Sequence, residues 1–188
     1  HASKVDEIEL MPMTPPVTLK PAPRATPAKI VGKVARRTAH LAMDAALIDG
    51  DHNWYTVYNE CRLLAERARA EGAPLPILIL HDVLWPYGRR DLYYNPETIP
   101  EEFRQPSAQK GVHLDQDELA KGASGLNPNH FNALHEGGPR NGVMTGLEDW
   151  MAEHPNPLRM VLLPIYFGLA IVVEEERLAR QPELAAVL

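Results

Sequence analysis

The chain has 188 residues, of which 45% are hydrophobic and 23% are charged, and its formal net charge is −6. This length and composition are typical of one soluble globular domain, or of one domain with an appendage, that buries a sizeable core. Apolar runs such as LPILIL are far too short to span a bilayer, and no signal peptide is evident. Cys61 is the only cysteine, which excludes an intrachain disulfide and a thiolate metal cluster and favours a cytoplasmic protein.

Residues 1–28 are predicted to form a proline-rich, basic arm or linker that precedes a domain over residues 29–188. Six prolines between positions 11 and 27 remove backbone donors and favour extended backbone. Residues 1–40 carry a net charge of +4 and the remaining residues −10, so the arm could bind phosphates or an acidic surface. It has no aromatic side chain to stack on bases, which argues against a nucleic-acid partner. Residues 26–43 predict a modest helix, with Thr26 as its N-cap.

The next segments predict a strand, a helix and a second strand. Residues 44–49 and 74–83 are short apolar runs that end in polar residues. Between them, apolar residues recur at spacings of three and four from Trp54 to Ala65, and Gly72 ends the pattern. This order predicts an α/β fold with a parallel sheet, its strands buried on both faces. Ligands of such sheets bind beyond the carboxyl ends of the strands.

The second half of the chain is less regular. Residues 91–125 predict a long ordered insertion or lid, because they contain several turn signals and little apolar periodicity. A helix is expected before Gly137 and another over residues 141–154, with Arg140 beside the Gly-Gly-Pro break between them. The last segment predicts two strands around a turn at 164–168, followed by a short helix.

Polar side chains at the two predicted strand ends are the candidate functional residues. Asp49 and Asp82 would meet at one crevice, where two carboxylates suit a divalent cation such as magnesium, and His81 could be a third ligand. His52 is placed to act as a general base. The plainer alternative is turn chemistry, with Gly50 allowing a bend and Asp51 capping the helix. His130 and His135, five residues apart, are interpreted as surface or capping residues.

Four separated strings carry a resemblance to a known family: DAALIDGDHNWYTVYNE, ILILHDVLWPYGRRDLYY, IPEEFRQP and NALHEGGPRNGV. Over residues 43–173 they resemble the C-terminal half of class I S-adenosylmethionine-dependent methyltransferases. The most similar branch contains metal-dependent sugar and natural-product O-methyltransferases and cephalosporin-hydroxylase-like proteins. The resemblance implies a partial Rossmann-like sheet with flanking helices, Asp49 and the pair His81–Asp82 as the metal site, and His52 as the base. Position 81 departs from the family's acidic pattern.

The resemblance also implies a cofactor, S-adenosylmethionine, whose usual glycine-rich turn has no counterpart before Asp49. The chain could be part of a longer enzyme, could be completed by another copy or partner chain, or could have lost methyl transfer. A half-sheet exposes an apolar edge, so an oligomer is expected, and residues 10–30 are a candidate cover for that edge.

Two functions follow. One is metal-assisted O-methylation of a hydroxyl on a small molecule or sugar; the other is a catalytically inactive scaffold or assembly protein. The alternative role of one aromatic and basic stretch is a packed loop whose arginines pair with Glu97, Glu101 and Glu102. For the enzyme, the acceptor pocket is predicted from this stretch: Trp85, Tyr87, Arg89, Arg90, Tyr93 and Tyr94.

Overall fold

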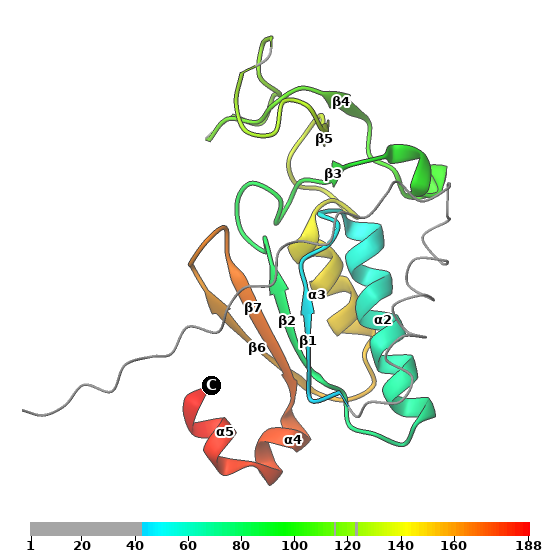
Figure 1. Cartoon of the computed structure of the whole chain (residues 1–188), viewed down its shortest axis with the longest axis vertical. Coiled ribbons are helices and arrows are strands. Elements are labelled where there is room, and N and C mark those ends of the chain that lie inside the picture. The colour runs from blue at the N-terminus through cyan, green and yellow to red at the C-terminus, as the bar shows by residue number, and fades with distance from the viewer. Residues whose placement is uncertain (1–42, 115, 123) are drawn as a thin grey trace, which may run out of the picture.

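The computed structural model describes residues 43–114, 116–122 and 124–188. The predicted arm, the edge-covering segment 10–30 and all but the last residue of the predicted helix over 26–43 lie outside the described residues. The described chain forms a four-stranded mixed sheet in the order β1-β2-β7-β6 and a three-stranded sheet in the order β3-β5-β4. Figure 1 shows the two long helices on one face of the larger sheet and the smaller sheet beyond the ends of β1 and β2.

The predicted strand–helix–strand unit is confirmed. β1 (Ala45–Ile48) and β2 (Ile77–His81) pair in parallel, and α2 (Trp54–Ala70) connects them. The N-cap of α2 is Asn53, whose Oδ1 accepts a 2.9 Å hydrogen bond from the backbone N–H of Thr56. The capping role considered for Asp51 is therefore wrong, because the cap position lies two residues later in the chain.

The larger sheet is mixed, so the prediction of a parallel sheet holds only for the pairing of β1 with β2. β6 (Leu158–Leu163) and β7 (Leu169–Glu174) form the predicted antiparallel pair, and β7 also pairs antiparallel with β2. The short connection between β6 and β7 forces the chain to reverse, whereas parallel neighbours need a long crossover. Two short helices, α4 (Glu175–Arg180) and α5 (Pro182–Val187), complete the chain.

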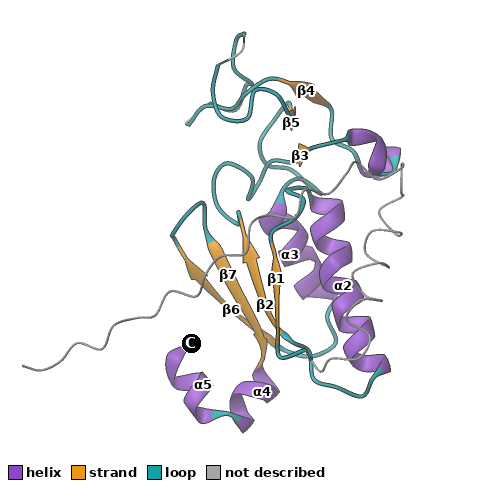
Figure 2. Ribbon diagram, in the orientation of Figure 1, coloured by secondary structure: helices purple, strands orange, loops and turns teal. Residues whose placement is uncertain are grey.

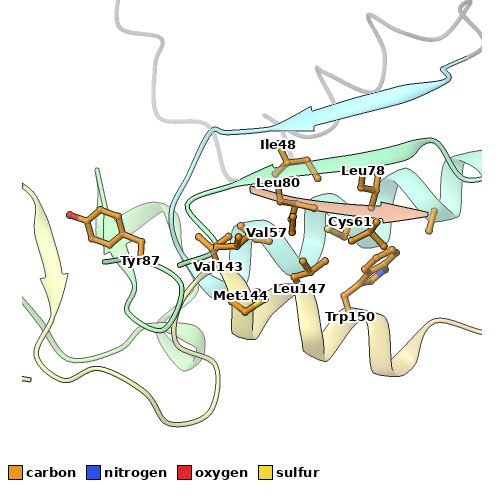
Figure 3. Close-up of a cluster of buried hydrophobic side chains, with 14 of the residues drawn as sticks. Ile48, Val57, Cys61, Leu78, Leu80, Tyr87, Val143, Met144, Leu147 and Trp150 are labelled. Atoms are coloured by element: carbon orange, nitrogen blue, oxygen red, sulfur yellow. The ribbon is translucent and has the colours of Figure 1, made fainter. Parts of the chain in front are cut away.

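The core lies between one face of the larger sheet and the two long helices, α2 and α3 (Val143–Glu153). Leu78 and Leu80 of β2 are fully buried there, against Cys61 of α2 and Leu147 of α3 (Figure 3). Complete burial of one leucine side chain contributes about 2 kcal/mol, so this face supplies the main apolar contribution to stability.

The opposite face of the same sheet is only partly covered. Successive side chains of a strand alternate between faces, so Leu47, Ile79, Ile171 and Val161 form one row across all four strands, as the register shows. Leu47 is 69% exposed. Both long helices lie on the other side of the sheet (Figure 2). The expectation that β1 is buried on both faces is therefore wrong within the described residues.

The smaller sheet contains part of the predicted insertion. Its strands are β3 (Leu92–Tyr93), β4 (Ser107–Gln109) and β5 (Phe131–Ala133), with 3-10 turns at Pro96–Thr98 and Glu101–Phe103. The helix expected before Gly137 is wrong, because β5 occupies this segment. Pairing of β5 with both β3 and β4 overrides any local helical preference.

A buried carboxylate joins the smaller sheet to the two long helices. Asp91 is fully buried, and its Oδ1 accepts hydrogen bonds from the backbone N–H of Trp54 at 2.7 Å and of Gly142 at 2.6 Å. Its Oδ2 accepts the hydroxyl hydrogen of Tyr93 at 2.6 Å. The side chain of Asn141 in turn accepts the backbone N–H of Asp91 at 2.7 Å. The starts of α2, α3 and β3 are therefore held at one point.

Replacement of Asp91 by alanine should destabilise the protein strongly, because it leaves buried donors without an acceptor. We expect a loss of about 3–5 kcal/mol in the free energy of unfolding, measured by urea denaturation followed by circular dichroism. Asp44→Ala is the control: the Asp44 side chain is 96% exposed, so its loss should change stability by no more than about 0.5 kcal/mol. A loss below about 1 kcal/mol for Asp91→Ala would contradict the central role of this carboxylate.

Candidate functional site

The structure brings the acidic ends of β1 and β2 together around His81. Nδ1 of His81 lies 3.3 Å from Oδ1 of Asp49 and 3.0 Å from Oδ2 of Asp82. Because β1 and β2 are parallel neighbours, the residues that follow them meet at the same edge of the sheet. The predicted proximity of Asp49 and Asp82 is therefore confirmed, whereas their role as metal ligands stays a prediction.

His52 joins this cluster from the loop that leads into α2. Its Nε2 lies 2.5 Å from Oδ2 of Asp82, and its Nδ1 lies 3.3 Å from the hydroxyl of Tyr94. The backbone N–H of Leu92 donates to the carbonyl of His52 at 2.9 Å, which fixes the loop against β3. In the neutral tautomer whose Nε2–H donates to Asp82, Nδ1 is an acceptor and faces the hydroxyl of Tyr94.

Asp82 is the central acceptor of the cluster. It is 6% exposed and has a φ of 58°, in the left-handed region that aspartate tolerates better than most residues. Burial alone would raise the pKa of Asp82, but the hydrogen bond and charge of His52, together with those of His81, outweigh it and lower the pKa below the ordinary value. Asp82 is therefore a carboxylate at neutral pH.

Further acids surround the cluster. Burial raises the pKa of Asp51, although its hydrogen bond from Thr56 opposes this, and burial together with the charge of Asp51 raises the pKa of Glu60 to about 7. Burial and the neighbouring aspartates also raise the pKa of Tyr94. The Tyr94 hydroxyl is therefore protonated and can donate to His52.

The donor set fits a divalent cation. One ligand atom from each of Asp49, His81 and Asp82 can be chosen so that all three lie within 4.8 Å of one another. Two carboxylates supply the oxygen ligands that Mg²⁺ and Mn²⁺ prefer, and an imidazole shifts the preference toward transition ions such as Mn²⁺, Fe²⁺ or Zn²⁺.

The residues predicted for an acceptor pocket do not form one group. Tyr87 lies beside the cluster, with its ring centroid 5.6 Å from that of His52, and its hydroxyl accepts a hydrogen bond from Asn127 at 2.6 Å. Trp85 is half-buried and precedes Pro86 in the turn after β2. Arg89 points to α3, where it forms an ion pair with Glu148 at 2.5 Å.

Arg90 and Tyr93 have internal partners and are each 1% exposed. The Arg90 guanidinium donates to the carbonyl oxygens of Ala133 and Asp117, each at 2.6 Å. The Tyr93 hydroxyl is bound to Asp91. Their polar groups therefore stabilise the loop structure, as the packing alternative expects. The acids that it named are wrong, because Arg89 pairs with Glu148, and Arg90 lies near Asp117 and Glu136.

His130 is a neighbour of the site that sequence reasoning missed. Its ring packs edge-on against Tyr94 with centroids 5.1 Å apart, and Tyr94 packs in the same way against His52 at 5.9 Å. Two polar atoms without a hydrogen-bond partner are buried in this part of the described structure, Nδ1 of His130 and Oδ1 of Asn132. No spacing signal connects position 130 to position 52, so only the fold could bring them together.

Comparisons of the chain with protein-family models, with curated proteins and with solved structures give no match. Within the described residues, every helix is too short or too polar to cross a membrane.

The elevated pKa of Glu60 predicts a specific pH dependence. Its pKa is about 7 in the folded protein against 4.5 as the ordinary value, so the folded state holds the proton more tightly. The stability contribution of Glu60 is fully present below pH 4.5 and is lost as the pH rises through 7. In urea denaturation at several pH values, Glu60→Gln should abolish this loss and be more stable than the wild type at high pH.

Glu66→Gln, on the same helix, is the matched control, because the Glu66 side chain is 48% exposed and forms only a surface ion pair with Arg62. It should leave the pH dependence of stability unchanged. Parallel curves for the wild type and Glu60→Gln would show that Glu60 titrates as an ordinary glutamate.

Proposed function

We propose that Asp49, His52, His81 and Asp82, the strand-end cluster, form the active site of a metal-assisted O-methyltransferase. The enzyme would use S-adenosylmethionine and methylate a hydroxyl of a small molecule or sugar, which is the acceptor. The observation that carries the proposal is the position of His52. Asp82 binds one ring nitrogen of His52 at 2.5 Å, while Asp82, Asp49 and His81 place three ligand atoms beside it. A base and a cation site thus share one carboxylate.

His52 performs the proton transfer. Asp82 orients the imidazole and stabilises its charged form, as a carboxylate does when it binds the second nitrogen of a catalytic histidine. Nδ1 then accepts the proton of the acceptor hydroxyl, in the position that the Tyr94 hydroxyl holds at 3.3 Å. The acceptor displaces Tyr94 from Nδ1 and becomes a better nucleophile as it loses its proton.

Asp49, His81 and Asp82 would hold the cation. A bound divalent ion supplies Lewis acidity, which lowers the pKa of a nearby hydroxyl toward the working range of a histidine base. To serve as a ligand, His81 must present an unprotonated Nδ1, which now faces both carboxylates at 3.0 and 3.3 Å.

The described residues do not include the glycine-rich turn that would bind S-adenosylmethionine. The sequence before Asp49 has no Gly-x-Gly turn, and Gly50, two residues after the end of β1, lies in the loop that carries His52. The proposal therefore requires that the cofactor surface comes from residues outside the described part, or from a second chain.

An assembly role is the second candidate function. It is favoured by the partly exposed row Leu47, Ile79, Ile171 and Val161, since apolar surface of this kind is usually buried against another element or chain. This role requires neither the base nor the cation site.

Calorimetric titration of the full chain tests the proposal in two steps. Mn²⁺ should bind to the wild type, and Asp82→Asn should weaken its binding at least about tenfold, the consequence of losing one charged ligand. Asp44→Asn, which removes an exposed carboxylate away from the cluster, should leave Mn²⁺ binding unchanged. S-adenosylmethionine should then bind to the Mn²⁺-loaded chain, and His52→Ala should retain this binding while abolishing methyl transfer to an acceptor.

Mn²⁺ binding that is equally strong in the wild type and Asp82→Asn would contradict the cation site. Specific Mn²⁺ binding without any binding of S-adenosylmethionine would contradict methyl transfer by this chain and favour the assembly role.

A further inference from the structure

A second polar feature lies at the same end of the molecule, on the loop before α3. The guanidinium carbon of Arg140 is 5.3 Å from the ring centroid of Trp54 and 5.3 Å from that of Phe103. These two rings are stacked, with centroids 5.8 Å apart and an interplanar angle of 19°. Trp54 is 6% exposed, whereas Arg140 is exposed, so the arginine covers the rings and faces solvent.

The backbone of the Arg140 loop is held on both sides. The side chain of Gln105 donates to the carbonyl oxygens of Pro139 at 3.1 Å and of Arg140 at 2.8 Å. The Asn141 side chain donates to the carbonyl of Gly137 at 2.8 Å and accepts from the backbone of Asp91. The guanidinium therefore stands on a fixed loop and a rigid aromatic surface, which lowers the entropy lost when it binds a ligand.

Arg140 differs in its charged partners from Arg89 and Arg90, whose backbones contact the same loop at Gly137 and Gly142. Arg89 has an ion pair with Glu148, and Arg90 has carboxylates at 3.6 and 3.8 Å. Within the described ranges, no carboxylate lies close enough to form an ion pair with Arg140, and its guanidinium lies over the two rings. One face of the guanidinium contacts carbon, and its N–H edge is open to an anion.

The adjacent helix end does not provide this anion site itself. The N–H groups of Val143 and Met144 at the start of α3 donate to the carbonyls of Tyr87 and Gly88, at 2.8 and 2.9 Å. The N–H of Gly142 donates to Asp91. These three N–H groups are therefore already used inside the protein, and the donors that we assign to a ligand at this point are those of the Arg140 side chain.

The position of Arg140 relates it to the strand-end cluster. Trp54 follows His52 by two residues, so their Cα atoms are at most about 7 Å apart. α2 runs back from the carboxyl end of β1, so its first residue lies at the edge of the sheet where Asp49 and Asp82 lie (Figure 1). The base and the arginine belong to one end of the molecule.

We propose that Arg140, supported by Trp54 and Phe103, binds an anionic group of the acceptor, a phosphate or a carboxylate. The planar guanidinium matches the two oxygens of either group. The claim that the bound anion belongs to the methyl acceptor rests on the proposed function. Binding of an anion by Arg140 does not depend on that function. An anion site at Arg140 narrows the substrate class to phosphorylated or acidic small molecules, such as a sugar phosphate or a sugar acid.

Binding is measured on the full chain without metal or cofactor, which separates this test from that of methyl transfer. The probes are inorganic phosphate, glucose 6-phosphate and glucuronate, with glucose as the neutral control. Each is titrated while the NMR signals of the Arg140 Nε–Hε group and of the Trp54 indole N–H are followed. Arg140→Met retains an apolar stem over the rings and removes the charge and the N–H donors. Arg159→Met is the matched control, since Arg159 is an exposed arginine with an ion pair to Glu175 at 3.1 Å.

We expect saturable binding of at least one anionic sugar, about tenfold or more tighter than that of glucose, with a shift of the Arg140 signal. Arg140→Met should remove this preference, and Arg159→Met should keep it. Tighter binding of glucose 6-phosphate than of glucuronate would assign the anion as a phosphate, and the reverse order would assign it as a carboxylate. Equal binding of the anions and glucose, or an unchanged preference in Arg140→Met, would overturn the proposal. Anion binding at Arg140 in a chain that binds no S-adenosylmethionine would retain this site and reject methyl transfer.

Discussion

The buried carboxylate of Asp91 is the constraint on which the rest of the structure depends. It binds the first backbone N–H of α2 and the N–H of Gly142 before α3, at 2.7 and 2.6 Å. His52 lies just before the first of these donors and Arg140 just before the second. Gly142, with a φ of 97°, fits because a Cβ atom there would lie 2.5 Å from the backbone nitrogen of Arg90. One desolvated acceptor thus sets the positions of both candidate binding features.

The part of the fold that could be predicted from the sequence is the part determined by local pattern. Apolar periodicity indicated β1, α2 and β2, and the parallel pairing that it implied was enough to bring Asp49 next to Asp82. The strand β5 could not be found in this way, because it exists through pairing with β3, almost forty residues earlier in the chain. The three residues of β5 are too few to show the alternation of apolar and polar side chains that marks a strand.

The sequence predicted the positions of the charged residues of the candidate site better than those of its aromatic residues. Tyr93 and Tyr94 are consecutive, and alternation along the chain sends one hydroxyl inward to Asp91 and the other toward His52. The sequence does not show which is which, because that choice depends on the register of β3 with β5. Arg90 was predicted to line the acceptor pocket because it lies in a polar stretch. The fold instead buries its guanidinium, which donates to the backbone carbonyls of Ala133 and Asp117.

The backbone conformation of Asp82 limits which residue types can occupy this position. A φ of 58° favours glycine, asparagine or aspartate, while the two histidines require an acid at 3.0 Å or less. Aspartate alone satisfies both requirements. Glutamate has the same charge, but it would meet the strained backbone and place its carboxylate one methylene further away. Glycine or asparagine at this position would retain the shape of the turn but remove the charge that binds His52 and His81, so under the proposed function such a substitution would remove activity without removing the fold.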